Sequence, residues 1–168
     1  PLRRSGLRRG TLIISVVTGV SIARIQSLLG AGVCIVRAVT NTPCTVRQGM
    51  TALALGSGVN AEQSAIAHRL FQRGGRVIEI DESLSEAFTG LSASGPAYIY
   101  LIIEALADGG VSVGIPRDIA IETVAQTVLG AAMMVKESGR HPASLRDDVT
   151  TPAGCTIGAL MMLEDGKI

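Results

Sequence analysis

The sequence predicts an α/β fold in which a mostly parallel sheet, covered by helices, is followed by an all-helical half. Up to Asp81, short runs rich in β-branched residues alternate with helical patterns, which is the order typical of βαβ units. Beyond Asp81 only helical patterns occur. Apolar residues make up 47% of the 168-residue chain, which is enough to offset the entropy of ordering and excludes a disordered chain.

The first half contains four predicted strands and two predicted helices. Residues 11–17 form a nearly continuous apolar run, which predicts a strand buried on both faces. Apolar residues at three- and four-residue spacing predict helices over 21–29 and 61–73, the second capped by Asn60 and ended by a Gly-Gly pair. Further β-rich runs predict strands over 34–40, 51–55 and 76–80.

Three further helices are predicted over 97–108, 117–136 and 156–163. We expect Gly109 and Gly110 to end the first of them, and Pro116 to open the second, where a missing N–H costs nothing. The change of pattern near Asp81 to Ser85 places the boundary between the halves there, which gives domains of residues 1–82 and 83–168.

The helix predicted over 97–108 is polar only along Tyr100, Glu104 and Asp108, a single stripe at four-residue spacing. A helix that is apolar on its other sides has to be buried nearly all round, and about 80 residues of helices cannot bury it alone. The sequence therefore predicts an obligate homodimer formed through the helical half.

Composition and patterning argue against several classes of function. With 2% aromatic residues and no Trp, the chain lacks the stacking platforms of single-stranded nucleic-acid binders, so we expect no nucleic-acid partner. The longest stretch without charge, residues 87–103, is broken by two Gly and a Pro, so we expect no membrane span. Three cysteines without C-x-x-C spacing and two isolated histidines indicate no disulfide framework and no metal site, which favours a reducing, cytoplasmic location.

Four segments are candidates for ligand binding, and each also has a purely structural interpretation. The first two are turns of small residues. Residues 56–61 follow a strand, open a helix and precede Glu79 by about 20 residues, as in a dinucleotide fingerprint; the alternative is an ordinary strand-to-helix turn. Residues 90–96 lead into the apolar helix. Either Ser92 or Ser94 caps that helix, or the small residues let a ligand approach its end.

The other two segments lie at the end of a strand and at the start of a helix. Thr40, Asn41 and Thr42 follow the second predicted strand, where ligands of open α/β sheets bind, unless they form a plain turn. Residues 150–156 form a small-residue turn whose backbone N–H groups either bind a carboxylate or phosphate or are capped by the chain; the Thr156 hydroxyl can reach the same ligand. No catalytic triad, suggestive carboxylate pair or Walker loop occurs, so an enzyme here would rely on a cofactor.

Four segments together resemble the pyrroline-5-carboxylate reductase family in sequence, order and spacing. They are RAVTNTP at 37–43, TGLSASGPAY at 89–98, EALADGGV at 104–111 and DVTTPAGCTI at 148–157. The resemblance runs from about Leu12 to the end of the chain. It implies the C-terminal part of a Rossmann-like parallel sheet domain followed by an all-α dimerisation domain. It also implies a homodimer or larger homo-oligomer that reduces 1-pyrroline-5-carboxylate to L-proline with NADPH or NADH, the last step of proline synthesis.

The resemblance also implies roles for individual residues. Cys155 and Thr156 match the pair at the substrate, where backbone N–H groups hold the carboxylate and the Thr156 hydroxyl, the expected catalytic group, bonds the ring nitrogen. The other expected substrate-binding residues are Val149, Ala153 and Gly154. The expected cofactor-binding residues are Val16, Val17, Thr18, Thr40, Asn41, Thr42, Glu82 and Asp148.

The chain departs from the family pattern in two ways. We expect the family's glycine-rich fingerprint to lie upstream of this sequence and its closing helices to lie beyond Ile168, so that both are absent here. Residues 56–61 are then expected to form an ordinary turn. Ala93 and Ala153 stand where the family usually has glycine, and each adds a methyl group where the backbone is approached closely. Three hypotheses result: a reductase with an intact substrate half that is inactive as this chain alone, a non-catalytic dimerising fragment, or a reductase of another imine or keto acid.

Overall fold

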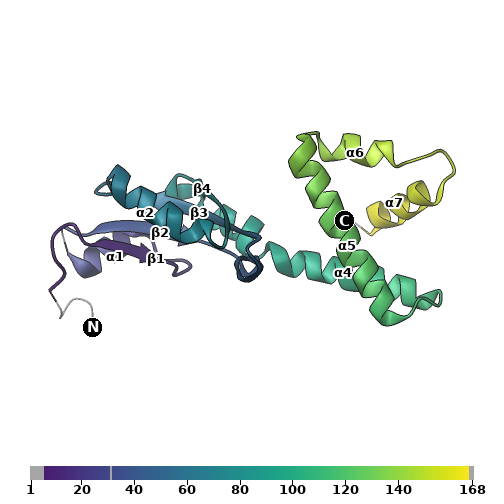
Figure 1. The fold of residues 1–168 in the computed structure, drawn as a ribbon, viewed down its shortest axis with the longest axis horizontal. Helices are drawn as coiled ribbons and strands as arrows, with labels where there is room; N and C mark the ends of the chain where they lie inside the picture. The colour runs from purple at the N-terminus through teal and green to yellow at the C-terminus, as the bar shows by residue number, and fades with distance from the viewer. Residues whose placement is uncertain (1–5, 31, 167–168) are drawn as a thin grey trace. The chain divides into compact units, whose positions relative to one another are not determined.

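The computed structural model describes residues 6–30 and 32–166, which divide into a unit that ends at Tyr100 and a unit that begins at Leu101 (Figure 1). The first unit contains a four-stranded sheet of β1 (Leu12–Ser15), β2 (Cys34–Val39), β3 (Gly49–Leu55) and β4 (Gly75–Glu79), in that order across the sheet. The pairs β1–β2 and β3–β4 are parallel, and β2–β3 is antiparallel. The prediction of a mostly parallel sheet is confirmed. The antiparallel pair follows from the short connection η2 (Thr42–Val46), because parallel neighbours need a long crossover.

The core of the sheet unit lies along β2, whose six residues are all buried. Val36, Ala38 and Leu53 pack against Ala67 of α2 (Ala61–Gln72) on one face. Side chains alternate along a strand, so Ile35 and Arg37 point to the other face. That face carries α1 (Ile22–Leu29), seen on the opposite side of the sheet from α2 in Figure 1, and α3 (Ser85–Phe88).

The first strand differs from its prediction. β1 ends at Ser15, and its first three residues are only partly buried, so the prediction of a strand buried on both faces is wrong. The physical reason is position, because β1 is an edge strand of the described sheet. Val16 and Val17 follow it as an exposed loop, 60% and 57% accessible.

Two local predictions in this unit are confirmed in detail. Asn60 caps α2 through a reciprocal capping box, in which the Gln63 N–H donates to Asn60 Oδ1 (2.9 Å) and the Asn60 N–H donates to Gln63 Oε1 (3.1 Å). Gly75 follows α2 with a φ of +146°, and a Cβ there would overlap the backbone of Gly49, its partner in β4–β3 pairing. A glycine is therefore required where the chain turns back into the sheet.

Helical turns continue without a break from Glu82 to Ser112, through η3 (Glu82–Leu84), α3, the π-helical turn η4 (Thr89–Ala93) and α4 (Gly95–Ser112). One alternative and one prediction fail here. Among the described residues no backbone N–H donates to the Ser92 or Ser94 hydroxyl, so neither serine caps α4, which η4 precedes. Gly109 and Gly110 do not end α4 but lie inside it, and the helix continues to Ser112.

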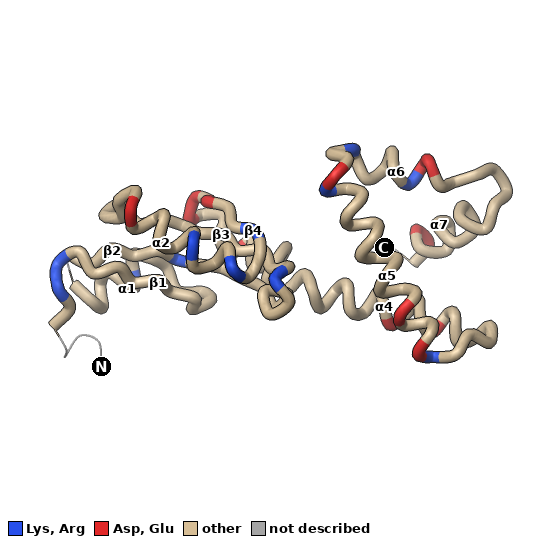
Figure 2. The backbone as a smooth tube through the Cα atoms, viewed as in Figure 1, with Lys and Arg blue, Asp and Glu red and all other residues tan. Residues whose placement is uncertain are grey.

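The remaining helices are α5 (Arg117–Ser138), α6 (Pro142–Asp148) and α7 (Cys155–Asp165). The helix α6 was not predicted, since only His141 and Pro142 mark its start and it spans two turns. Figure 2 shows charged residues near the ends of α5 and on α6, with none along most of α5. By length and apolar composition alone, Glu82–Ser112 and Arg117–Ser138 could each cross a membrane, which the sequence expectation had not anticipated.

A pH-sensitive contact joins α2 to β4. Ser64 Oγ donates a hydrogen bond to Glu79 Oε1 (2.7 Å), and His68 Nε2 lies 2.8 Å from the same oxygen. The hydrogen bond from Ser64, followed by that from His68, lowers the pKa of Glu79 below its ordinary value of 4.5. A carboxyl with a lowered folded-state pKa stabilises the fold above its unfolded pKa, and that contribution is lost as the pH falls through the folded value.

We therefore expect the urea midpoint of this chain to fall as the pH drops below 4.5, and to fall less in Glu79→Gln, which cannot titrate. The matched control is Glu62→Gln, which removes an exposed carboxyl from the first turn of α2. Circular dichroism at pH about 7 and about 3.5 measures the difference. Equal acid sensitivity of Glu79→Gln and Glu62→Gln would show that the contact has no part in it.

Candidate functional site

The first group of predicted site residues lies at the carboxyl ends of two neighbouring strands. Val16, Val17 and Thr18 follow β1, and Thr40, Asn41 and Thr42 follow β2. Because β1 and β2 are parallel, both segments lie at the same edge of the sheet, where open α/β sheets bind ligands. The structure thus brings together six of the eight residues expected to contact a cofactor.

Asn41 has its side chain engaged within the protein. Its Oδ1 accepts the Met50 N–H (2.9 Å), and its Nδ2 donates to the Ser92 carbonyl (3.2 Å). Asn41 therefore ties the end of β2 to the start of β3 and to η4. Thr40 is tied in the same direction, since Thr51 Oγ1 donates to Thr40 Oγ1 at 2.9 Å.

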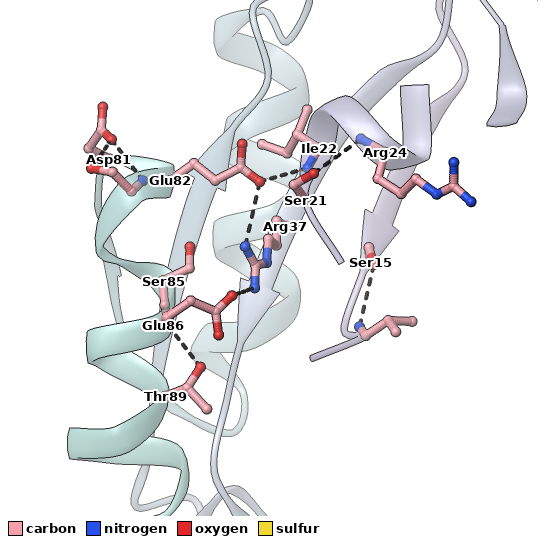
Figure 3. Close-up of polar contacts among 12 residues, drawn as sticks. Ser15, Ser21, Ile22, Arg24, Arg37, Asp81, Glu82, Ser85, Glu86 and Thr89 are labelled. Atoms are coloured by element: carbon pink, nitrogen blue, oxygen red, sulfur yellow. Dashed lines mark hydrogen bonds and ion pairs between the residues drawn. The ribbon is translucent and has the colours of Figure 1, made fainter. Parts of the chain in front are cut away.

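Glu82, also expected at the cofactor, lies at the beginning of the helical run (Figure 3). Its Oε1 accepts the N–H of Ile22, the first residue of α1, at 2.6 Å. The same oxygen lies 3.6 Å from Nη1 of Arg37, whose Nη2 is 2.6 Å from Glu86 Oε1. Glu82 and Ile22 also line a cavity of about 490 Å³, together with residues that begin β2 and follow β3.

The segment 56–61 occupies the opposite edge of the sheet. It follows β3, and since β3 runs antiparallel to β2, its end lies near the beginning of β2 and away from Thr40. The Gly56 N–H donates to the Ile35 carbonyl, and Asn60 caps α2. Glu79, which a fingerprint would assign to a ribose, bonds Ser64 and His68 instead. These contacts are those of an ordinary strand-to-helix turn.

The second group of predicted residues forms the turn before α7, in the other unit. The Gly154 N–H donates back to the Thr151 carbonyl (3.1 Å), and Ala153 adopts a left-handed conformation with φ +57°. Gly154 is the N-cap and supplies no side-chain cap. Within residues 6–30 and 32–166, the N–H groups of Ala153, Cys155 and Thr156 donate to no turn carbonyl and to no side chain.

Asp148 and Val149 lead into this turn. Arg140 Nη1 donates to Asp148 Oδ2 at 2.6 Å, and this hydrogen bond lowers the pKa of Asp148 and raises that of Arg140. Val149 is exposed, and the Thr150 hydroxyl donates to the Arg146 carbonyl at 2.7 Å. Asp148 and Val149 also line a mainly apolar cavity of about 490 Å³ between α5 and α6.

The described residues contain no group of three or more His, Cys, Asp or Glu side chains placed to hold a metal ion. The thiols of Cys34, Cys44 and Cys155 are free. The turn before α7 offers backbone N–H groups and one hydroxyl, and in the other unit the end of β2 carries neutral polar side chains. Backbone N–H groups at the start of a helix can bind an anion, whereas redox chemistry requires a cofactor.

The model of the family described as "Pyrroline-5-carboxylate reductase dimerisation" matches residues 82–168, which is more than half of the chain. The chain belongs to the pyrroline-5-carboxylate reductase family. A pyrroline-5-carboxylate reductase of Synechocystis is 50% identical over 153 residues, covering 91% of this chain and 57% of the relative. One of Arabidopsis thaliana is 44% identical over 164 residues, covering 98% of this chain and 59% of the relative.

Solved structures of the family agree. A Plasmodium falciparum pyrroline carboxylate reductase with NADP bound has a TM-score of 0.88 at 34% identity, covering 93% of this chain and 63% of that one. A Coxiella burnetii pyrroline-5-carboxylate reductase has a TM-score of 0.87 at 40% identity, covering 93% and 58%. These matches confirm the recognition of the family and the fold class. The chain spans about 60% of the length of the relatives it matches.

Sequence reasoning missed the cluster of Arg37, Glu82 and Glu86. A signal was present, because Arg37 stands in the middle of an apolar strand whose other residues are suited to burial. A charged residue there has to find an opposite charge when the strand is buried. Which of the 14 acidic residues supplies that charge depends on contacts 45 and more positions away, which no local pattern encodes.

We expect Ala153→Gly to stabilise the chain by up to about 1 kcal/mol. A left-handed conformation costs a residue with a Cβ about 1–2 kcal/mol, and the greater freedom of glycine in the unfolded chain offsets part of that gain. Urea unfolding measures the change. Ala132→Gly, the same substitution inside α5, should instead destabilise by about 1 kcal/mol. Loss of stability in both variants would contradict the strained turn.

Proposed function

We propose that this chain carries the substrate half of a pyrroline-5-carboxylate reductase, which reduces 1-pyrroline-5-carboxylate to L-proline with NADPH or NADH in proline biosynthesis. The observation that carries the proposal is the start of α7. There a glycine N-cap leaves the first N–H groups of the helix open, and Thr156 adds a hydroxyl in the first turn. Open N–H groups at the positive end of a helix bind a carboxylate without any basic side chain.

The chemistry requires one hydride at the carbon of the C=N bond and one proton on its nitrogen. In the proposed site, the N–H groups near Ala153, Cys155 and Thr156 bind the substrate carboxylate and so fix the ring. The Thr156 hydroxyl donates a hydrogen bond to the imine nitrogen, which draws electrons from the C=N bond and makes its carbon a better hydride acceptor. When bound, a reduced nicotinamide supplies the hydride.

The residues at the ends of β1 and β2 fit the nicotinamide end of such a cofactor. Val16 and Val17 present an exposed apolar surface at the same edge of the sheet as Thr40, Asn41 and Thr42, where contacts of Asn41 with Met50 and Ser92 hold the end of β2 in place. The reduced nicotinamide is an uncharged ring with one amide group, and it fits a neutral set of protein groups better than a charged set. The NADP-bound relative from Plasmodium falciparum supports the same assignment. Glu82 and Asp148 remain proposed neighbours of the cofactor.

A second candidate function is non-catalytic dimerisation through the helical unit. It is favoured by large apolar residues that are exposed on this single chain, among them Leu101, Leu129 and Met162. The match of the dimerisation model to 82–168 supports a homodimer or larger homo-oligomer in either case. The free thiols support the cytoplasmic location that the sequence predicts.

The two candidates are separated by one assay. We expect no oxidation of NADPH with 1-pyrroline-5-carboxylate by this chain alone, and turnover by a chimera that adds the terminal segments of the Synechocystis relative which the chain does not cover. If the chain carries the substrate half of the enzyme, calorimetry should detect binding of proline to the dimeric chain. A chimera that folds, binds NADPH and gives no turnover would leave dimerisation as the function.

In the active chimera, we expect Thr156→Ala to lower kcat/KM, because the transition state loses the free energy of one hydrogen bond, about 1–3 kcal/mol. Thr156→Ser keeps the hydroxyl and should keep most of the activity. Thr127→Ala, which removes an exposed hydroxyl in α5, is the matched control. Steady-state kinetics with varied substrate measures the loss. If Thr156→Ala and Thr127→Ala behave alike, the hydroxyl takes no part in the reaction.

A further inference from the structure

Arg37 is the one buried charged side chain among the described residues, 4% exposed in the middle of β2. Strands β1 and β3 flank it, with Ser15 and Ala54 opposite it in register. Its guanidinium reaches across one face of the sheet to two carboxylates of the helical run, Glu86 at 2.6 Å and Glu82 at 3.6 Å (Figure 3).

Glu82 carries this contact on to α1. Its Oε1 accepts the Ile22 N–H at 2.6 Å, while Ser21 Oγ accepts the Arg24 N–H at 3.2 Å, so the first turn of α1 is held by both. The Arg37 guanidinium thus holds the Glu82 carboxylate, and Glu82 in turn holds the start of α1. The loop that precedes this helix begins with Val16, Val17 and Thr18, and β2 itself leads to Thr40 three residues beyond Arg37.

Net stability does not explain a charge at this place. A buried ion pair seldom stabilises a fold more than apolar side chains of the same volume would, because both charges lose their hydration. Here the burial is not even fully compensated, since Arg37 Nε and the neighbouring Ser85 Oγ have no hydrogen-bond partner among the described residues. What a forked guanidinium provides, and an apolar side chain does not, is a fixed direction toward two acceptors.

We propose that Arg37 is a positioning residue for the cofactor end of the sheet. Through Glu82 it holds the start of α1, and with it residues 16–18, in fixed register with residues 40–42, which follow its own strand. The inference rests on the proposed function, because it concerns the same cofactor-binding segments. It assigns to Arg37 no contact with cofactor or substrate.

The test uses the chimera with the Synechocystis segments, with Arg37→Met as the variant and Arg76→Met as the matched control, an exposed arginine of β4. We expect the KM for NADPH to rise about 10- to 100-fold in Arg37→Met, the range expected when binding groups are displaced. The KM for 1-pyrroline-5-carboxylate and the dissociation constant of proline should stay within about twofold, since those ligands bind at α7. Arg37→Lys, which keeps the charge but not the fork, should give an intermediate KM for NADPH.

A folded Arg37→Met with an unchanged KM for NADPH would overturn the proposal, and so would an equal loss in all three constants, which marks a purely structural residue. If Arg37→Met does not fold, Arg37→Lys decides instead, because it keeps the charge on β2 but loses the fork that reaches both carboxylates. An unchanged KM for NADPH in a folded Arg37→Lys then overturns the proposal.

The dissociation constant of NADPH, measured by fluorescence, separates this proposal from the proposed function. A parent chimera that binds NADPH but does not reduce 1-pyrroline-5-carboxylate contradicts the function, and the NADPH constants of parent and variant still decide the role of Arg37. A parent that binds no NADPH overturns both.

Discussion

The direction of β3 relative to β2 is the constraint on which the sheet unit depends. Since β1 and β2 run parallel, the segments after them meet at one edge, and residues 16–18 come to lie with residues 40–42. Since β3 runs back, the glycine-rich segment 56–61 is carried to the other edge. The same six-residue strand, buried along its whole length, thus fixes which loops can share a ligand and which cannot.

In the helical unit, the corresponding constraint is a short turn that stays open. Residues 151–154 use one internal hydrogen bond and place Ala153 in a left-handed conformation, which directs the chain into α7 without a side-chain cap. Most helices satisfy their first N–H groups with a Ser, Thr, Asp or Asn at the N-cap. Here the N-cap is glycine, and Thr156, one residue inside α7, keeps its hydroxyl available for another partner.

The elements with strong periodicity could be predicted from the sequence, and the elements set by distant contacts could not. The helix α2 and its Asn60 cap follow local rules, whereas the turn before α7 could be recognised as a small-residue turn but not as an uncapped one. Gly109 and Gly110 look like helix terminators, yet both lie inside α4, which ends at Ser112, shortly before Gly114 with its φ of +99°. Arg37 could be recognised as a residue in need of a partner, but its partners come from the segment after β4.

The helical run Glu82–Ser112 and the helix α5 have the length and composition of a membrane span, so their polar residues indicate whether lipid or protein covers them. A carboxylate near the middle of a bilayer costs about 2.5–3.5 kcal/mol or more. Glu104 lies within α4, Glu122 lies within α5, and Asp108 of α4 forms an ion pair with Arg117 at the start of α5. At a protein–protein interface these carboxylates can form hydrogen bonds with the partner or with water at the edge of the interface. Lipid chains offer neither. The dimerisation model matches both helices, which supports the proposal that a second copy of the chain covers their apolar faces.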